Sequence, residues 1–292
     1  MKWRGRRSSS NVERRSSAGG GGMRTAGGIG GFGLIIVIVL TLIMGGNPLD
    51  ALNSGITPGG GSSQEQSGTY TPRNEEEAEI EEFLSVVLAD TEDVWNEIFE
   101  QHGATYREPK MVLYQDTVNS GCGFASKQMG PFYCGADETV YIDVSFTNQL
   151  RDQFGAGGDF PMAYVLAHEV GHHVQLLTGA LQEVQGLRGR VPDVQYNNEM
   201  VKLELQADYY AGVFAHYVGQ KGYLEQGDIQ EGLKAAEGVG DDRIIEMQGG
   251  TANPDNFQHG SSEQRMRWFE RGYQYGDLEN GNTFQVEDAK DL

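Results

Sequence analysis

Cysteine is scarce in this chain, which has 292 residues and only Cys122 and Cys134. One widely spaced cysteine pair is a weak indication of a metal site. We therefore expect the two residues to form one disulfide bond outside the cytoplasm, worth roughly 3 kcal/mol if the cross-link acts through chain entropy. A zinc-binding cysteine pair is the alternative.

Positive charge is scarce outside the N-terminal part of the chain. Residues 1–44 carry seven Lys/Arg and one Glu, a net charge of +6, whereas the remainder carries 15 Lys/Arg against 41 Asp/Glu, a net charge of −26. Nucleic-acid binding needs a basic surface, so the acidic body argues against that class of protein. The simplest interpretation of its charge is solubility, and the two parts of the chain are expected to meet different surroundings.

Charge is absent between Arg24 and Asp50. The strongly apolar part, residues 32–44, is short for a membrane span of about 20 residues, but its uncharged flanks can complete a crossing. A cleaved signal peptide is the rival interpretation, although more than 30 residues precede the apolar part, which is long for such a signal. Because basic residues stay in the cytoplasm, we expect one membrane anchor with the N-terminus inside and the acidic body outside.

Composition then divides the chain into five parts. We expect a disordered basic segment, a transmembrane anchor, a Gly/Ser/Pro linker, one folded domain and a frayed acidic tail. Their bounds are 1–24, 25–49, 50–73, 74–276 and 277–292. The expected fold class is α+β and mainly helical, with a small β-sheet beside one central helix.

That central helix contains the pattern His-Glu-x-x-His, at residues 168–172. Four residues separate His168 from His172, so both imidazoles project from one helix face and can bind one zinc ion. Glu169 lies beside the open coordination position, where it can deprotonate a zinc-bound water. The alternative is an ordinary core helix with hydrogen-bonded histidines. His173 points about 100° away from His172 and is expected to be a hydrogen-bonded neighbour.

The flanking residues support a buried helix. Asp159 and Pro161 are typical of a helix start, Gly179 of a helix end, and the residues between are apolar nearly all round. Two histidines and a glutamate in such a helix need partners, because unpaired buried polar groups are costly.

A second helix, expected over residues 197–219, supplies two acids. Glu204 and Asp208 share one face with small Ala residues, so another helix can approach closely there. Glu204 follows His172 by 32 residues, enough for this helix to return antiparallel, and we expect Glu204 to be the third zinc ligand. Asp208 would accept the ring N–H of a zinc-bound histidine. Exchanged roles, or two solvated acids on an exposed face, are the alternatives.

Residues 110–146 are expected to contribute strands, including a hairpin formed by residues 131–134 and 139–143. An edge strand beside the zinc helix commonly pairs with an extended substrate backbone, and we assign that role to the region of Tyr141. A sheet that only packs on the helix is equally compatible. Further helices are expected over residues 74–102, 145–154 and 228–247, and another opens with a capping box of Ser261 and Gln264.

His259 precedes this last helix. A donor opposite the zinc would stabilise the oxyanion that forms when hydroxide attacks an amide. An equally good interpretation is that His259 lies at the end of a loop and only hydrogen-bonds to backbone groups. His216, two turns beyond Asp208, is expected to be structural.

Four stretches carry a family resemblance. They are the opening MKWRGRRS with NVE, HEVGHHVQ at 168–175, LELQAD with YAG at 203–212, and HGSS at 259–262. The chain resembles the bacterial neutral zinc metallopeptidases, a membrane-anchored family, and its HExxH and ExxxD pair is similar to that of gluzincin-type membrane proteases. The resemblance implies a zincin-like domain in the bacterial inner membrane, facing the periplasm. It also implies Glu204 as ligand, Asp208 behind the ligands and His259 near the oxyanion.

The sequence therefore predicts a membrane-anchored endopeptidase that uses Zn²⁺ to hydrolyse a peptide or protein substrate, with Glu169 as general base. One apolar segment, where similar proteases have several, places the site in water rather than in lipid. A tethered zinc adaptor without catalysis is one alternative, although structural zinc sites have four protein ligands and this chain offers three. A zinc amidase acting on cell-wall peptides is another. The sequence does not indicate an oligomeric state.

Overall fold

The structure is a computed structural model that describes residues 1–16 and 70–292. The expected anchor at 25–49 and nearly all of the expected linker at 50–73 lie outside these residues. In the two described ranges, none of the helices combines the length and the apolar character that a bilayer crossing requires.

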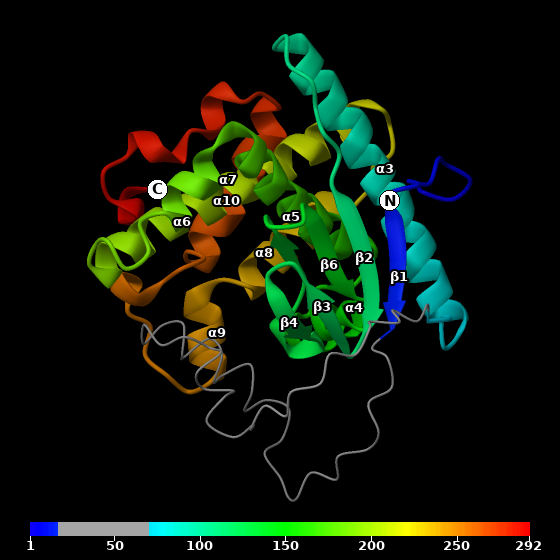
Figure 1. The fold of residues 1–292 in the computed structure, drawn as a ribbon, viewed down its shortest axis with the longest axis horizontal. Helices are drawn as coiled ribbons and strands as arrows, with labels where there is room; N and C mark the ends of the chain where they lie inside the picture. Colours follow the sequence, from blue (N-terminus) through cyan, green and yellow to red (C-terminus); the bar gives the residue numbers. More distant parts are fainter. Residues whose placement is uncertain (17–69) are drawn as a thin grey trace, which may run out of the picture.

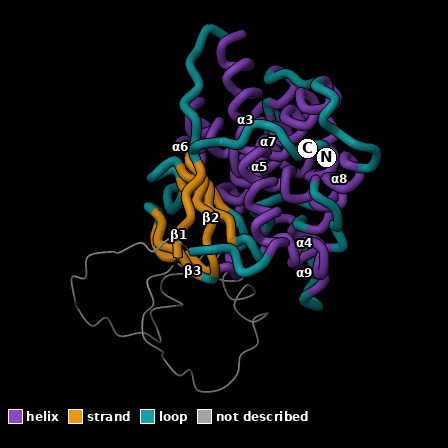
Figure 2. The backbone as a smooth tube through the Cα atoms, turned by 90° about the vertical axis from the view of Figure 1, so that its right-hand side faces the viewer, coloured by secondary structure: helices purple, strands orange, loops and turns teal. Residues whose placement is uncertain are grey.

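The described residues form a mainly helical α+β fold, as the sequence predicts. Figure 2 shows the strands gathered on one side of the molecule and most of the helices on the other. The helices are α3 (Glu75–Gln101), α4 (Phe146–Phe154), α5 (Phe160–Thr178), α6 (Ala180–Gln185), α7 (Asp193–Gln220), α8 (Asp228–Gly238), α9 (Asp241–Met247) and α10 (Ser262–Tyr275). Short 3-10 turns lie at Lys127–Met129, Pro254–Asn256, Glu279–Gly281, Thr283–Gln285 and Ala289–Asp291.

One sheet has four strands in the order β1-β2-β6-β5. Its strands are β1 (Val12–Ser16), β2 (Lys110–Gln115), β6 (Thr139–Asp143) and β5 (Phe132–Cys134). The first three are parallel, and β5 is antiparallel to β6. A separate hairpin consists of β3 (Thr117–Ser120) and β4 (Gly123–Ser126), and the predicted disulfide joins Cys122 to Cys134 at 2.03 Å.

The apolar run of β2 is explained by burial on both of its faces. Met111 and Leu113 belong to the main core with α3 and α5, whereas Val112 and Tyr114 pack with Val118 and other residues of the small core under the hairpin. Successive side chains of a strand point to opposite faces, so a strand covered on both sides is apolar throughout.

The predicted edge position of Tyr141 is wrong. Tyr141 lies in β6, between Val112 of β2 and Phe132 of β5, and its ring stacks on that of Phe132 at 4.9 Å. The edge of the sheet on this side is β5. The hairpin of β5 and β6 was predicted correctly. Which of its two strands forms the edge of the sheet depends on the pairing of β2 with β6, two strands that are distant in the sequence.

Disorder of the whole segment 1–24 is also wrong for its first 16 residues. They form β1 and contribute Trp3, which is 4 % exposed, to the main core. The segment runs along α3 in Figure 1. Its basic composition suggested a solvated chain, but four of its arginines are paired with acids of α3.

The tail 277–292 is not frayed. Thr283 donates to the backbone oxygen of Lys202 at 2.7 Å, and Leu292 is 5 % exposed beneath α10, where its backbone oxygen accepts from Trp268. Most acidic residues of the tail face solvent, while its apolar side chains are buried or partly buried against the cores. Net charge alone was therefore a poor guide to its order.

Helices α5, α7 and α10 converge near the predicted metal ligands, and glycines let α7 and α10 approach closely. A Cβ at Gly212 of α7 would lie 2.1 Å from the backbone oxygen of Phe269, and one at Gly272 of α10 would lie 2.0 Å from that of Tyr209. No side chain fits in such a gap. The two backbones therefore touch, and this contact brings the first turn of α10 towards α5.

Candidate metal centre

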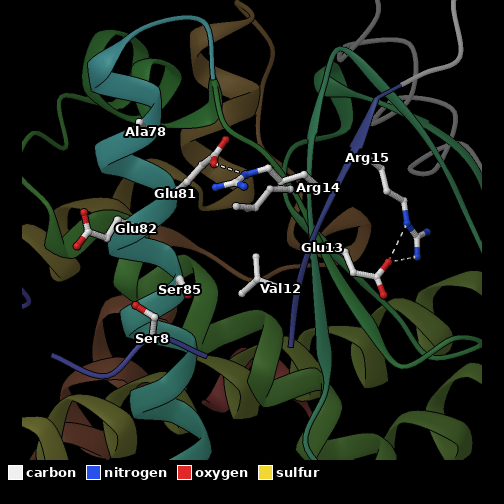
Figure 3. A pocket seen from close by; sticks show the side chains of 10 residues that line it. Ser8, Val12, Glu13, Arg14, Arg15, Ala78, Glu81, Glu82 and Ser85 are labelled. Atoms are coloured by element: carbon white, nitrogen blue, oxygen red, sulfur yellow. Dashed lines mark hydrogen bonds and ion pairs between the residues drawn. The ribbon is translucent and has the colours of Figure 1, made fainter. Parts of the chain in front are cut away.

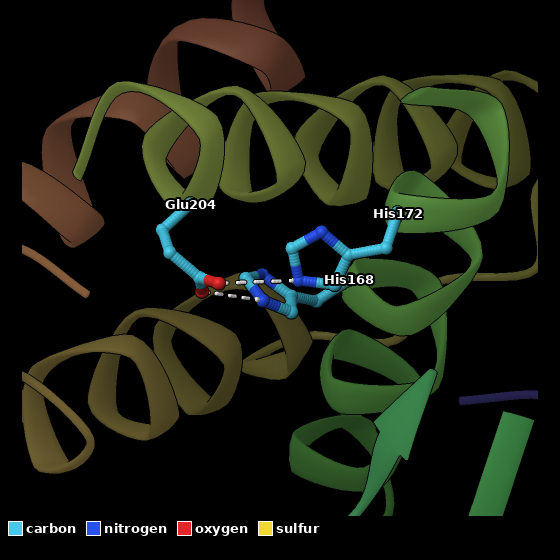
Figure 4. A group of neighbouring side chains, drawn as sticks. All are labelled: His168, His172 and Glu204. Atoms are coloured by element: carbon cyan, nitrogen blue, oxygen red, sulfur yellow. Dashed lines mark hydrogen bonds and ion pairs between the residues drawn. The ribbon is translucent and has the colours of Figure 1, made fainter. Parts of the chain in front are cut away.

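Helix α5 presents the two histidines of the HExxH pattern. It starts after Asp159, with Pro161 in its first turn, and ends at Gly179, whose φ of 93° suits glycine. His168 and His172 lie one turn apart on the face that meets α7, with ring centroids 4.8 Å apart. Figure 4 shows both rings directed at the carboxylate of Glu204.

The three side chains converge through their ligand atoms. Nε2 of His168 lies 3.2 Å from Oε2 of Glu204, and Nε2 of His172 lies 3.4 Å from Oε1. Zinc bonds of about 2.0–2.2 Å arranged as a tetrahedron place neighbouring donors roughly 3.3–3.6 Å apart. Both histidine–carboxylate separations lie near this range, and one ligand atom from each of the three residues lies within 4.8 Å of the others, so the group could hold a zinc ion.

Close packing of α5 and α7 places Glu204 there. A Cβ at Gly171 would lie 3.2 Å from both the Cα and the backbone oxygen of Ala207. The small residues of α7 thus allow the close approach that the sequence predicts. In the resulting arrangement Glu204 faces the Nε2 atoms of both histidines, while Asp208, one turn on, lies behind His168.

Asp208 is fully buried and has three partners. Its Oδ1 lies 2.8 Å from Nδ1 of His168 and accepts from the hydroxyl of Tyr164 at 2.6 Å. Arg265 of α10 donates through Nε to Oδ2 at 2.8 Å and through Nη2 to Oδ1 at 3.0 Å. An Nδ1–H bond to Asp208 leaves Nε2 of His168 free to bind a metal, and an ionised partner makes that nitrogen more basic.

A matching contact orients the second histidine. Nδ1 of His172 lies 2.8 Å from Oε1 of Gln175, which is fully buried. The amide of Gln175 donates in turn to the backbone oxygen of Leu203 at 2.7 Å and to Oε1 of Gln206 at 3.1 Å. Each histidine therefore has its Nδ1 engaged by a side chain that is itself fixed by helix packing.

The charges of the cluster support one another. Burial disfavours the charged form of His168, but Asp208 and Glu204 outweigh it and raise the pKa of His168 to about 10. Burial would raise the pKa of Glu204, yet His172 and His168 hold it well below its usual range. Burial likewise opposes ionisation of Asp208, whose pKa is lowered by Arg265 and His168. Both acids are thus carboxylates near neutral pH.

Glu169 has the environment of a proton carrier. Its side chain lies in the buried part of α5, where loss of solvent raises the pKa of its carboxyl group and the neighbouring imidazoles partly oppose that rise. A carboxylate with a raised pKa accepts and returns protons more readily near neutral pH.

His259 reaches the same region from the loop before α10. Its Nδ1 lies 3.0 Å from Oδ1 of Asp241, whose Oδ2 accepts from the backbone N–H of His259 at 2.7 Å. Burial opposes the charged form of His259, but Asp241 outweighs burial and raises its pKa to about 9, with Glu204 adding to the effect. His259 is therefore held as a cation near Glu204.

The other histidines lie outside the cluster. His173 bonds to the hydroxyl of Tyr133 at 2.8 Å and to the backbone oxygen of Arg107 at 2.5 Å, as expected of a hydrogen-bonded neighbour. His216 is hydrogen-bonded to the backbone oxygen of Tyr273.

Four residues of the site were missed from the sequence: Tyr164, Gln175, Asp241 and Arg265. Tyr164 and Gln175 lie one turn from His168 and His172 on the same helix, so helical spacing alone would have found them. Arg265 and Asp241 carry no such signal, because they reach the site only through the packing of α9 and α10.

Comparison with known proteins gives a family. Residues 1–284 match the family described as "Putative neutral zinc metallopeptidase". The chain is 46 % identical over 287 residues to the uncharacterized protein YpfJ of Escherichia coli strain K12, covering 97 % of this chain and 99 % of that protein.

It is also 46 % identical over 195 residues to the uncharacterized protein Mb2605 of Mycobacterium bovis, covering 63 % of this chain and 64 % of that protein. No solved structure matches. With a family match over nearly the whole chain and zinc-compatible donors at its centre, this chain belongs to the neutral zinc metallopeptidase family.

Proposed function

We propose that the chain is a zinc-dependent endopeptidase acting on a peptide or protein substrate. The observation that carries the proposal is the convergence of His168, His172 and Glu204, with donor separations that suit zinc, beside the buried carboxylate of Glu169. Three protein ligands leave a coordination position for water, as catalytic zinc sites do.

Zinc, when bound, lowers the pKa of water and polarises a substrate carbonyl. Glu169 takes the proton of the attacking water and passes it to the leaving amine. His259, held as a cation by Asp241, donates a hydrogen bond to the carbonyl oxygen as it becomes negative. Asp208 and Gln175 keep the imidazoles in the tautomer that presents Nε2.

We assign substrate alignment to β5 instead of the Tyr141 region. In the described part of the chain β5 pairs with β6 alone, so its outer backbone groups are available to an extended peptide. Tyr133 of β5 bonds to His173 of α5, which ties this edge to the helix that bears the histidines.

Two alternatives make different predictions. A zinc adaptor would use the metal only to brace α5 and α7, but it gives no role to Glu169 or to the cationic His259. A cell-wall amidase would share every group of the site and differ only in its substrate.

Zinc content and casein cleavage, measured on the purified chain, test the proposal. The Glu169→Gln variant should retain one zinc ion and lose cleavage, because it lacks the base but no ligand. Glu183→Gln, an exposed substitution on the next helix, is the matched control and should cleave as the wild type does. Undiminished cleavage by Glu169→Gln would remove Glu169 from the role of base. Zinc binding without cleavage of casein or of any peptide library would contradict the endopeptidase and leave the adaptor and the amidase.

A further inference from the structure

The first 16 residues, here called the arm, dock on the metal domain by strand pairing. Residues Val12 to Ser16 pair in parallel with Met111 to Gln115, adding a fourth strand to the sheet. The backbone N–H of Ser9 also donates to the backbone oxygen of Ser85 in α3 at 3.0 Å. The arm is thus hydrogen-bonded to both the sheet and the helix.

Charge complementarity holds the arm against α3. This helix carries eleven Asp or Glu and no Lys or Arg. Arginines of the arm pair with five of these acids: Arg4 with Glu79, Arg6 with Asp90, Arg7 with Glu92 and Asp93, and Arg14 with Glu81. Figure 3 shows Arg14 reaching from β1 to Glu81 across the groove between strand and helix.

Two of the paired acids are almost completely buried. Glu81 is 3 % exposed, and Glu92, 2 % exposed, accepts from Arg7, Ser9 and Asn11 of the arm. Buried carboxylates are rare without such partners. The buried acids of α3 are therefore matched to this particular segment.

The arm also reaches the start of the metal-binding helix. Trp3 packs edge-on against Phe83 of α3, with ring centroids 5.6 Å apart. Its indole N–H donates to Asp159 at 3.1 Å, at the N-cap position of α5. That carboxylate makes no capping bond to its own helix, so its partner is the arm.

We propose that the arm docks in cis as a fixed part of the metal domain and therefore lies in the same compartment as residues 70–292. A single membrane crossing between the two, as the sequence alone suggested, would separate β1 from β2 and the four paired arginines from α3. The two described ranges meet at one side chain, which suits docking within a single chain. The carboxylate of Glu81 accepts from Arg14 at 2.7 Å and from Tyr70 at 2.5 Å, and these residues lie on either side of residues 17–69.

A cysteine pair in the full chain tests this. Ser16 and Gln115 are directly paired, so Ser16→Cys with Gln115→Cys should form a disulfide within one chain when intact cells are treated with a membrane-permeant oxidant. The matched control is Ser16→Cys with Lys110→Cys, five residues and about 16 Å further along β2, which should not cross-link. Mass spectrometry of the digested chain identifies the link.

The outcomes separate the possibilities. A link within one chain for the first pair alone supports the proposal. No link in cells places the arm elsewhere and overturns it, and a link between two chains shows exchange between copies, which also overturns docking in cis. In the same background Arg7→Glu, which faces Glu92 and Asp93, should lower the yield several-fold, whereas Arg190→Glu on an exposed turn should not. Neither result depends on peptidase activity.

Discussion

Replacing Arg265 with methionine is the most informative perturbation of the site. Arg265 is 5 % exposed and makes two hydrogen bonds to Asp208, which is fully buried. Methionine preserves much of the side-chain volume but removes the cation that contributes most to keeping Asp208 ionised, and leaves His168 as its remaining charged partner. Removing one partner of a buried ion pair costs about 3–5 kcal/mol, so the free energy of unfolding should fall by that amount.

The same change should weaken zinc binding. Without Arg265 the pKa of Asp208 rises, because the cation that chiefly opposes its burial is gone. A protonated Asp208 is a poorer acceptor for Nδ1 of His168, and losing such support of a ligand typically costs about 10–100-fold in metal affinity. Urea unfolding of the metal-free protein and competitive zinc titration measure the two effects separately.

Arg267→Met is the control, since Arg267 lies on the same helix, half of its side chain is exposed, its ion pair with Glu263 lies at the surface, and its one further bond is to the backbone oxygen of Leu292. Its effect should stay within about 1 kcal/mol. Adding Asp208→Asn to Arg265→Met should recover part of the lost stability, because an amide is cheaper to bury than a carboxylate that has lost its guanidinium partner. A loss below about 1 kcal/mol with unchanged zinc affinity would refute the dependence of the site on this ion pair.

Three further predictions concern packing and protons. Gly212→Ala places a methyl group 2.1 Å from the backbone oxygen of Phe269, so α7 and α10 must separate and the melting temperature and zinc affinity should both fall; unchanged values would contradict the close contact. Zinc binding at pH 7 should release at least one proton, because His168, with a pKa of about 10 in the metal-free protein, must lose its proton to bind; calorimetry in buffers of different ionisation enthalpy counts it, and zero release would be inconsistent. The His259 pair with Asp241 should stabilise the metal-free protein fully below about pH 6.5, the unfolded pKa, and lose its effect as pH rises through about 9. Since 42 % of the His259 side chain is exposed, we expect this pair to contribute only about 1 kcal/mol to the free energy of unfolding. The wild type should exceed His259→Gln by that amount at low pH, and the difference should vanish by pH 10.

Much of the metal centre was predictable because its key residues lie on single helices. The spacing of His168 and His172 follows from one helical turn, and Glu204 and Asp208 repeat the same step on α7. A resemblance to known zinc proteases then suggested which acid faces the metal. Arg265 was not predictable in this way, because its place depends on the glycine contact between α7 and α10.

The errors have one physical origin, which is contact between distant parts of the chain. The arm was predicted to be disordered because its own composition is basic and its partner α3 begins at residue 75. The tail was predicted to fray for the same reason, although the hydroxyl of Thr283 donates to α7 and the backbone oxygen of Leu292 accepts from α10. Tyr141 was assigned to an edge because strand order cannot be deduced from one hairpin.

The coordination of zinc in the loaded protein tests the central claim most directly. X-ray anomalous scattering from a crystal of the zinc-loaded chain should place one ion bonded to Nε2 of His168, Nε2 of His172 and a carboxylate oxygen of Glu204, with the remaining position open to solvent. An ion bonded to Asp208 in place of Glu204, a fourth protein ligand that closes the site, or a protein that binds no zinc would contradict it.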